Sequence, residues 1–369
     1  MLFKWLNRTS ERVEEAASGV SIRVVGVGGG GGNAVRRMAD DGIHGVRFLA
    51  LNTDIQALRG LRQVQTFAIG PKTTGGTGSG GQPEVGRKAM RESQAQVGGL
   101  LQGADMVFIA AGMGGGTGTG AASMVADLAR KQGALTVGVV TQPFGFEGSK
   151  RRANADQGLT RLKQKVDTLI VVENDRLLPA LEGRVELEKA FRLADEVLRQ
   201  GVQGISDIVT VSGMINVDFA DVKAVMAGGG SAFMAIGHGE GRDAAAQAAR
   251  SALANPLFDA PLEGASGVLL NVTGGPDLTL GQVHEVADIV HEAADSGANV
   301  IFGVVQQRRM KGRVSVTLVG TGIDWEEEPV IEQAMEVITK RREPLAPASS
   351  SVSRNGHSQA ALAGTRPLL

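Results

Sequence analysis

A glycine-rich segment at residues 112–122, GMGGGTGTGAA, directly follows the apolar run MVFIAA at 106–111. Residues 112–120 contain six glycines and two threonines. Because glycine has no Cβ, the main-chain N–H groups of such a loop can approach a ligand closely and bind an anion. The threonines would add hydroxyl groups facing phosphate or metal. The segment therefore predicts a loop that closes over a terminal phosphate.

Two further glycine segments strengthen this prediction. Gly26, Gly28 and Gly31 satisfy G-x-G-x-x-G between an apolar run and a helical pattern, and residues 73–86, TTGGTGSGGQPEVG, form the third segment. The first motif alone also fits a tight turn or a dinucleotide fold, in which Asp54 would bind the ribose. Several glycine loops at the ends of neighbouring strands favour a polyphosphate instead.

A lysine-containing phosphate loop is absent, because G-x-x-x-x-G-K-[ST] occurs nowhere in the sequence. Main-chain N–H dipoles, helix N-termini and Mg²⁺ would then have to offset the phosphate charge. No residue is assigned as a metal ligand on this basis.

The glycine loops must be positioned by a sheet. Apolar runs alternate with helical patterns at 33–42 and 121–133, which predicts a parallel sheet covered on both faces. A long helix with three-to-four apolar spacing follows at about 186–205. Further apolar runs predict a second, smaller α/β domain within 208–323. The runs of the first set are 22–27, 48–53, 106–112, 135–140 and 168–172, and those of the second are 208–217, 233–239, 267–275, 299–307 and 313–322.

Composition narrows the classes of protein. The chain has 369 residues, a net charge of −1 and no cysteine. The lack of cysteine excludes disulfides, thiolate metal sites and a cysteine nucleophile. The balanced charge gives no indication of nucleic-acid binding, and no apolar run approaches the roughly 18 residues of a membrane-spanning helix. We expect a soluble, intracellular α/β protein.

Six motifs, in order, carry a family resemblance: GVGGGGGNAV, ALNTD, QPEVGRKA, GGGTGTGAA, TQPFGFEG and NVDFADVKAVM. Between about residues 22 and 323 the chain resembles the tubulin and FtsZ superfamily, and most specifically bacterial FtsZ. The resemblance implies an α/β fold with a parallel, Rossmann-like GTPase domain, a central helix and a smaller α/β domain. The implied division is an N-terminal extension at 1–20, the GTP-binding domain at 21–185, the central helix at 186–207, the C-terminal domain at 208–323, a terminal helix at 324–343 and a disordered tail at 344–369.

The base-binding residues are expected on the long helix. Phe191 and Asp195 are four residues apart and share one face. A carboxylate there would accept from the N1–H and N2–H₂ groups of guanine, which adenine lacks. Periodicity alone favours Phe191 as core and Asp195 as solvated surface; the resemblance reverses this and assigns both to guanine. It also implies contacts with GTP or GDP from Gly29, Gly30, Gly31, Gly32, Asn33, Gly114, Gly115, Gly116, Thr117, Gly118, Glu147, Arg151 and Asn174.

The catalytic residues are expected away from the glycine loops. Asp218 and Asp221 are three apart at a predicted helix start, a spacing that puts both carboxylates on one face but is also common in helix capping. The resemblance implies that Asn216, Asp218 and Asp221 enter the nucleotide pocket of the next subunit and position water and a cation. The implied partner is a head-to-tail homopolymer, because such a contact need not close into a ring.

The two ends of the sequence leave alternatives open. Residues 1–8, MLFKWLNR, resemble the start of an interfacial helix that would contact a membrane weakly; the alternative is a frayed terminus with incidental apolar residues. The segment QAALAGTRPLL lacks the acidic residues of the family's adaptor-binding peptide, so membrane adaptors stay uncertain. We expect a cytoplasmic protein at the division site, on the inner face of the membrane. The alternatives are an FtsZ-like paralogue with a specialised or regulatory filament role and an NAD-binding oxidoreductase.

Overall fold

The computed structural model describes most of the chain between residues 19 and 323. The described residues are 19–43, 45–178, 186–211, 213–255, 262 and 264–323. Contacts divide the chain into two compact units, Met1–Asp324 and Trp325–Leu369, and all described residues belong to the first. The expected membrane contact of residues 1–8, the terminal helix and the tail lie outside the described residues. Within those residues, no helix combines the length and apolar character needed to cross a membrane.

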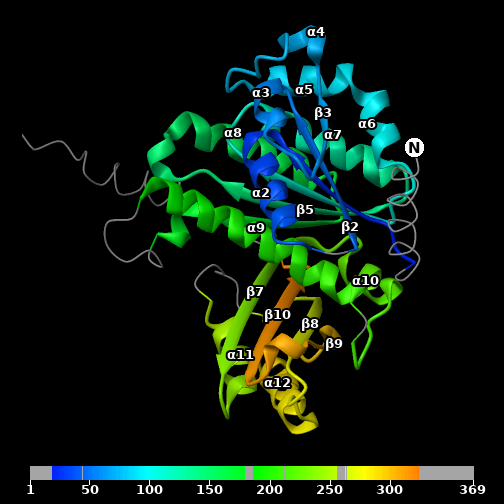
Figure 1. Cartoon of the computed structure of the whole chain (residues 1–369), viewed down its shortest axis with the longest axis vertical. Helices are drawn as coiled ribbons and strands as arrows, with labels where there is room; N and C mark the ends of the chain where they lie inside the picture. Colours follow the sequence, from blue (N-terminus) through cyan, green and yellow to red (C-terminus); the bar gives the residue numbers. More distant parts are fainter. Residues whose placement is uncertain are drawn as a thin grey trace, which may run out of the picture. The chain divides into compact units, whose positions relative to one another are not determined.

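The N-terminal part is built on six parallel strands in the order β3-β2-β1-β4-β5-β6 (Figure 1). This confirms the predicted parallel sheet. The strands are β1 Ile22–Val27, β2 Val46–Asn52, β3 Gln65–Ala68, β4 Met106–Gly112, β5 Leu135–Gln142 and β6 Thr168–Glu173.

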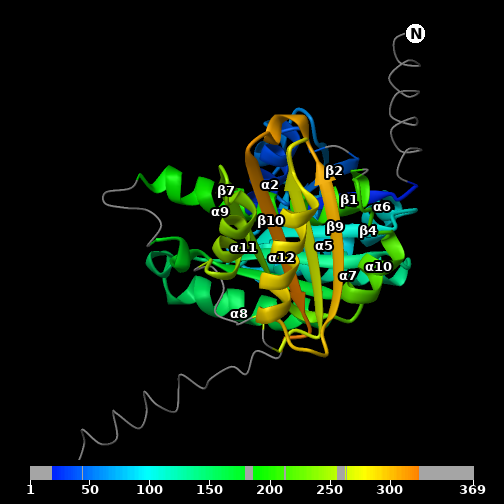
Figure 2. The same ribbon diagram turned by 90° about the horizontal axis from the view of Figure 1, so that it is seen from below.

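The C-terminal part continues the same sheet. Strand β6 pairs in parallel with β7, and β7-β10-β8-β9 follow, so that ten strands form one sheet. Strand β10 is antiparallel to both β7 and β8, whereas β8 and β9 are parallel. Figure 2 shows α11 and α12 against these strands. The strands are β7 Gly230–Glu240, β8 Gly267–Gly274, β9 Asn299–Gln306 and β10 Arg313–Thr321.

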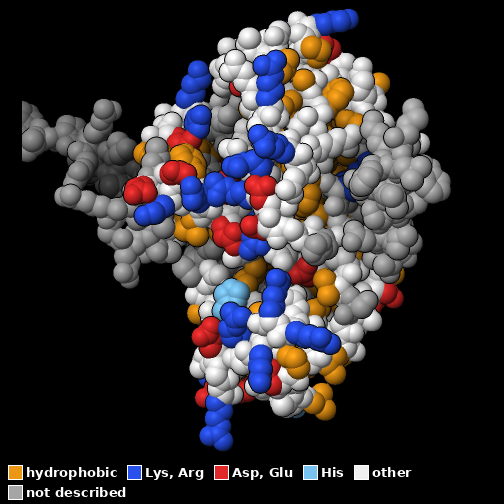
Figure 3. Space-filling view, in the orientation of Figure 1, with side chains coloured by type: hydrophobic (Ala, Val, Ile, Leu, Met, Phe, Trp, Pro, Cys, Tyr) orange, Lys and Arg blue, Asp and Glu red, His pale blue; other side chains and the backbone are white. Residues whose placement is uncertain are grey.

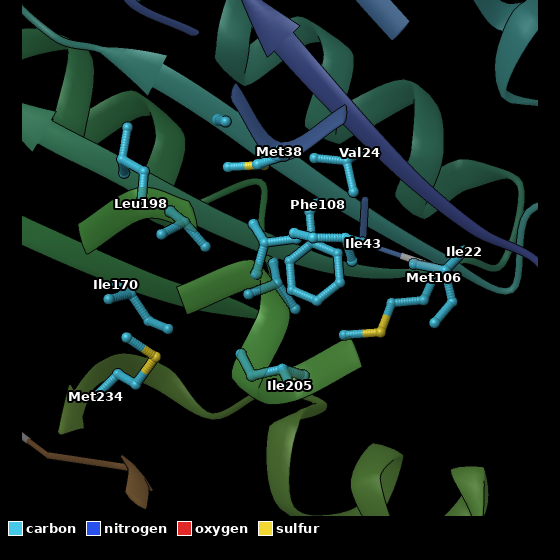
Figure 4. Packing of buried hydrophobic residues seen from close by; sticks show 14 of the residues in the cluster. Ile22, Val24, Met38, Ile43, Met106, Phe108, Ile170, Leu198, Ile205 and Met234 are labelled. Atoms are coloured by element: carbon cyan, nitrogen blue, oxygen red, sulfur yellow. The ribbon is translucent and has the colours of Figure 1, made fainter. Parts of the chain in front are cut away.

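Helices cover both faces of the parallel strands, as predicted. Alternate residues of β4 belong to two separate apolar clusters, because successive side chains of a strand point to opposite faces. Phe108 belongs to the cluster that contains residues of α2, α9 and α10, whereas Ile109 belongs to the cluster that contains residues of α5, α6, α7 and α8. Figure 4 shows Phe108 with Met38 of α2 and Leu198 of α9 in the first cluster. The sheet is therefore buried on both sides, and its strand ends are left to form a site.

Helices begin earlier than the apolar periodicity indicates. Helix α2 begins at Gly28 instead of residue 33, and α7 begins at Thr117 instead of residue 121. The first turns contain glycine, which carries no periodic signal, so sequence patterns miss them. The helices are α2 Gly28–Asp40, α3 Ile55–Arg59, α4 Pro71–Thr74, α5 Pro83–Glu92, α6 Gln94–Leu101, α7 Thr117–Lys131, α8 Ser149–Lys163, α9 Leu187–Thr210, α10 Phe219–Met226, α11 Ala244–Leu253 and α12 Leu280–Ala293, with short 3₁₀ helices η1 Gly145–Glu147, η2 Asn174–Leu177 and η3 Arg308–Met310.

Two parts of the sequence pattern differ from the structure. The run at 208–217 is not a strand: α9 extends to Thr210, and Ile215 makes only an isolated bridge to Val304 of β9. β-Branched residues at the end of a long amphipathic helix produced the strand-like pattern. Strand β3 was not predicted, because its four residues, QTFA, are too few and too polar to stand out.

Candidate functional site

A cavity of about 500 Å³ opens where β1, β4, β5 and β6 end, within the range of small-molecule sites. In an open α/β sheet, ligands bind beyond the carboxyl ends of the strands. Most predicted nucleotide-binding residues line this cavity. The lining residues are Gly29, Gly30, Asn33, Ser79, Gly112, Met113, Gly115, Gly116, Thr117, Gly118, Thr141, Pro143, Glu147, Arg151, Asn174, Phe191, Ala194 and Asp195.

The phosphate end is formed by the first turns of α2 and α7. A Cβ at Gly28 would lie 2.8 Å from the nitrogen of Gly118, so the two helix starts are in backbone contact. By contrast, a Cβ at Gly29 or Gly115 would meet no protein atom within 4 Å. Helix N-termini carry free N–H groups and partial positive charge. The first turns of α2 and α7 therefore present main-chain N–H donors that suit a phosphate chain.

Three predicted glycines do not line the cavity. A Cβ at Gly31 would lie 2.1 Å from the carbonyl oxygen of Ala110, so Gly31 permits α2 to pack on β4. Gly32 is buried behind the loop, and the nearest atom to a Cβ there belongs to Leu61 at 3.9 Å. Gly114 has φ +96° and packs against the carbonyl of Arg151. Gly31 therefore permits close backbone packing and Gly114 an unusual backbone angle, whereas nothing in the structure requires glycine at position 32.

Hydroxyl groups fix the glycine loops to one another. Oγ1 of Thr117 lies 2.6 Å from Oγ1 of Thr53 and 3.1 Å from Oγ of Ser79. Oγ1 of Thr119 accepts from the N–H of Gly114 at 2.9 Å. The sequence analysis expected these threonines to face phosphate or metal. In the structure Thr119 instead orders the loop, and Thr117 connects three loops while also lining the cavity.

The segment after β5 supplies the side wall. Oε1 of Glu147 accepts from the N–H of Phe144 at 3.0 Å, and its other oxygen pairs with Arg151. Asn154, which the sequence analysis missed, donates to the carbonyl oxygens of Gly114 at 3.3 Å and Gly81 at 3.4 Å. A polar residue on a largely exposed helix gives no sequence signal for such a role. Ser79, also unassigned, lies inside the third glycine segment that the sequence did single out.

The base end is lined by aromatic and amide groups. Phe191, 38% exposed, meets the buried ring of Phe144 edge-on with centroids 5.5 Å apart, and Phe144 stacks on Phe146 at 5.1 Å. Oδ1 of Asn174 is buried without a hydrogen-bond partner in the described chain. Buried polar groups normally have partners. Because Oδ1 of Asn174 is free to accept a hydrogen bond at the cavity wall, the site suits a ligand that carries N–H or O–H donors.

Asp195 faces this end of the cavity from α9. Its side chain is 14% exposed, and its Oδ2 lies 3.1 Å from Nε of Arg37 on α2. Burial raises the pKa of Asp195 to about 6, although Arg37 and Arg36 act in the opposite direction. At pH 7 the Asp195 side chain is still mostly ionised. It can therefore accept two parallel N–H bonds from guanine, as the family resemblance implies.

Asp54 does not support the oxidoreductase alternative, in which its carboxylate would bind the ribose. Its carboxylate caps α3 and accepts from the N–H groups of Gln56 at 2.8 Å and Ala57 at 3.4 Å. Asp54 is also not among the residues that line the cavity. Within the described residues, no group of three or more His, Asp or Glu side chains could hold a metal ion.

Asn216, Asp218 and Asp221 do not line the cavity. All three are exposed and lie before or within the first turn of α10. Asp218 caps α10, since its carboxylate accepts from the N–H of Asp221 at 2.9 Å. Oδ1 of Asn216 accepts from the N–H of Gly213 at 2.6 Å. The capping role and a role in chemistry are compatible, because a cap uses only one carboxylate oxygen.

The α9 residues that line the cavity lie in the first half of this helix, whereas α10, which begins at the two aspartates, follows its other end (Figure 1). Asp195 lies in the first half of this helix, and α10 follows its C-terminal end at Thr210. Fifteen residues separate these positions, which at about 1.5 Å per residue is roughly 22 Å. One subunit therefore does not bring both parts together.

A parallel sheet whose helix N-termini surround a phosphate and base pocket defines a nucleotide-binding protein. The model of the Tubulin/FtsZ family, GTPase domain, matches residues 21–182, and that of the FtsZ family, C-terminal domain, matches residues 230–324. The chain belongs to the FtsZ family, and it is a GTPase.

Solved structures agree with this assignment. The chain is similar to an empty FtsZ dimer from M. jannaschii, with 44% identity over 82% of this chain and 88% of that one, and a TM-score of 0.78. A mutant of the same FtsZ shows 43% identity over 86% and 96% of the two chains, with a TM-score of 0.79. A GTPgS-bound protofilament of CetZ2 from Haloferax volcanii, at 24% identity over 87% and 99% of the chains and a TM-score of 0.73, shares the fold. The bacterial type indicated by the motifs stays a prediction.

Proposed function

We propose that this protein is a self-assembling cytoskeletal GTPase that forms the division ring, and that the synergy loop of one subunit completes hydrolysis in the pocket of the next. The observation that carries the proposal is the separation of the cavity from Asp218 and Asp221 along α9. The similar solved structures include an FtsZ dimer and a CetZ2 protofilament, which supports self-assembly.

In this mechanism the pocket and the loop have separate tasks. The first turns of α2 and α7 hold the phosphate chain, and Phe191 and Asp195 hold guanine. Exposed Asn216, Asp218 and Asp221 of the neighbour position the attacking water and stabilise charge, which is most of what phosphoryl transfer requires. Mg²⁺ would neutralise phosphate charge and be held mainly by phosphate and water oxygens, since it often has few protein ligands. The place of action would be the inner face of the membrane at the division site.

A complementation experiment tests the shared site. Asp218→Asn leaves the pocket intact, and Gly115→Asp puts a negative charge into the phosphate cradle, where a side chain meets no protein atom. Each variant alone should hydrolyse GTP slowly. If random mixing at equal amounts pairs intact pockets with intact loops, up to about a quarter of interfaces become complete and turnover reappears.

The control is each variant at the total protein concentration of the mixture. Absence of any gain on mixing, together with wild-type turnover that is independent of protein concentration, would contradict the shared site. Recovery of turnover without localisation to division sites in cells would favour the specialised filament role.

A further inference from the structure

The ion pair between Arg37 and Asp195 joins two helices at the base end of the cavity. Nε of Arg37 on α2 lies 3.1 Å from Oδ2 of Asp195 on α9. The side chain of Arg37 is 29% exposed, and that of Asp195 is 14% exposed. The Arg37 Nε–H is buried and makes no hydrogen bond within the described chain, so this contact is electrostatic. Arg37 itself does not line the cavity.

Most other charged side chains around Asp195 form ion pairs with residues other than Asp195. On α9, Glu188 pairs with Arg192 and Glu196 pairs with Arg199. Figure 3 shows side chains of both signs gathered over α2 and α9. Across the cavity, Glu147 pairs with Arg151.

Arg36 on α2 is the remaining cation that acts on Asp195. It lies 3.9 Å from Asp40 in a largely solvated pair and lowers the pKa of Asp195 less than Arg37 does. The histidines among the described residues lie on β7 and α12. Arg37 is therefore the main group that opposes the effect of burial on Asp195.

We propose that Arg37 is the positioning residue for base recognition: it holds the Asp195 carboxylate as an acceptor at the cavity wall and so makes the site select a base with two adjacent N–H donors. The inference rests on the proposed role of Asp195 toward guanine. Arg37 acts through Asp195 and does not touch the base.

The chemistry predicts a pH-dependent selectivity. Guanine offers N1–H and N2–H₂ to a carboxylate, whereas hypoxanthine offers N1–H alone. A protonated Asp195 loses much of its ability to accept both bonds. Since burial already raises the pKa of Asp195 to about 6, removal of the opposing cation raises it further and moves protonation toward neutral pH.

The experiment compares the affinities of GDP and inosine diphosphate for dilute, nucleotide-free full-length protein by calorimetry from pH 5.5 to 8.5. The two ligands share phosphates and ribose, so their affinity ratio reports the base alone. In the wild type, the preference for GDP should fall as the pH drops through about 6. In Arg37→Met the midpoint should move up by about one pH unit, and the preference at pH 6 should fall about fivefold. Arg37→Lys should restore part of it.

Arg36→Met is the matched control and should change the preference less than about twofold, because Arg36 is the weaker influence on Asp195. If Arg37→Met weakens GDP and inosine diphosphate equally, or leaves the pH midpoint in place, Arg37 only packs α2 on α9 and the inference is wrong.

Asp195→Asn separates this inference from the proposed function. Loss of the GDP preference in Asp195→Asn but not in Arg37→Met overturns the positioning role alone. Retention of the preference in Asp195→Asn overturns base recognition by Asp195 and the positioning role with it.

Discussion

The N–H of Gly114 donates to Oγ1 of Thr119 at 2.9 Å, so the bond lies within a single glycine-rich segment. Gly114 has φ +96°, an angle that other residues rarely adopt. The hydroxyl of Thr119 is therefore the partner that fixes an otherwise permissive part of the chain. We expect this bond to keep the glycine-rich loop rigid, because the threonine side chain is turned into the loop.

Thr119→Val should test this rigidity. Valine keeps the shape of threonine but leaves the buried N–H of Gly114 without an acceptor, which costs about 1–3 kcal/mol. We expect a lower free energy of unfolding and weaker GTP binding. Denaturant unfolding and nucleotide titration measure the two effects. Thr160→Val is the control, because the Thr160 hydroxyl bonds only to the carbonyl oxygen of Asp156 on the surface of α8. Equal effects from both variants would contradict the assignment.

A pair of glycine variants should separate packing from ligand contact. Gly31→Ala places a Cβ 2.1 Å from the carbonyl oxygen of Ala110, so it should destabilise the protein by about 1–3 kcal/mol. Gly29→Ala meets no protein atom within 4 Å, so stability should change by less than about 0.5 kcal/mol. GTP affinity of Gly29→Ala should nevertheless fall about tenfold, because its N–H can no longer approach phosphate closely. Denaturant unfolding of the nucleotide-free variants measures the effect on stability. Calorimetric titration with GTP measures the effect on affinity.

Asp218 allows capping and chemistry to be tested separately. Asp218→Asn can still accept from the N–H of Asp221, whereas Asp218→Ala cannot and should lose about 1 kcal/mol of stability. If the carboxylate acts in the neighbour's pocket, both variants should reduce GTP turnover in filaments about 100-fold. Turnover is measured in sedimented filaments and compared with the melting temperature. Normal turnover in Asp218→Asn would assign this residue to capping alone.

Asp195 should make the nucleotide-free protein less stable at neutral pH. Its folded pKa is raised from 3.8 to about 6, so between these values the folded state binds more protons than the unfolded state. Stability from this group is present at low pH and is lost as the pH rises from about 4 to 6. Asp195→Asn should therefore be more stable than the wild type by about 1–3 kcal/mol at pH 8 and nearly equal at pH 4. Denaturant unfolding at both pH values checks this, and a wild-type advantage at pH 8 would contradict it.

Much of the fold and of the pocket follows from local sequence. Strands β1 and β4 have the predicted bounds because each is a largely apolar run, IRVVGV and MVFIAAG, preceded by a polar residue. The glycine segments indicated a phosphate site, because a loop that brings its main-chain N–H groups close to a phosphate requires glycine. The roles of single glycines did not follow: Gly29 and Gly31 are alike in sequence, and only the position of Ala110 distinguishes them.

Long-range relationships were not predictable from the sequence. The contact of Arg37 with Asp195 joins two residues that are 158 positions apart in the sequence. The continuation of the sheet from β6 into β7 depends on pairing across α9 and α10, and no local pattern encodes it. The family resemblance assigned Phe191 and Asp195 to guanine, which periodicity alone did not, and this assignment stays a prediction.

The pairing of β6 with β7 involves Thr168 with Gly230, Leu169 with Ser231 and Ile170 with Ala232. A chain truncated before Gly230 would keep the entire pocket but turn β6 into a bare sheet edge with unpaired N–H and C=O groups. Such an edge is a template for association with other strands. The GTP-binding half is thus a poor candidate for expression as a fragment, because its solubility depends on a strand that the rest of the chain provides.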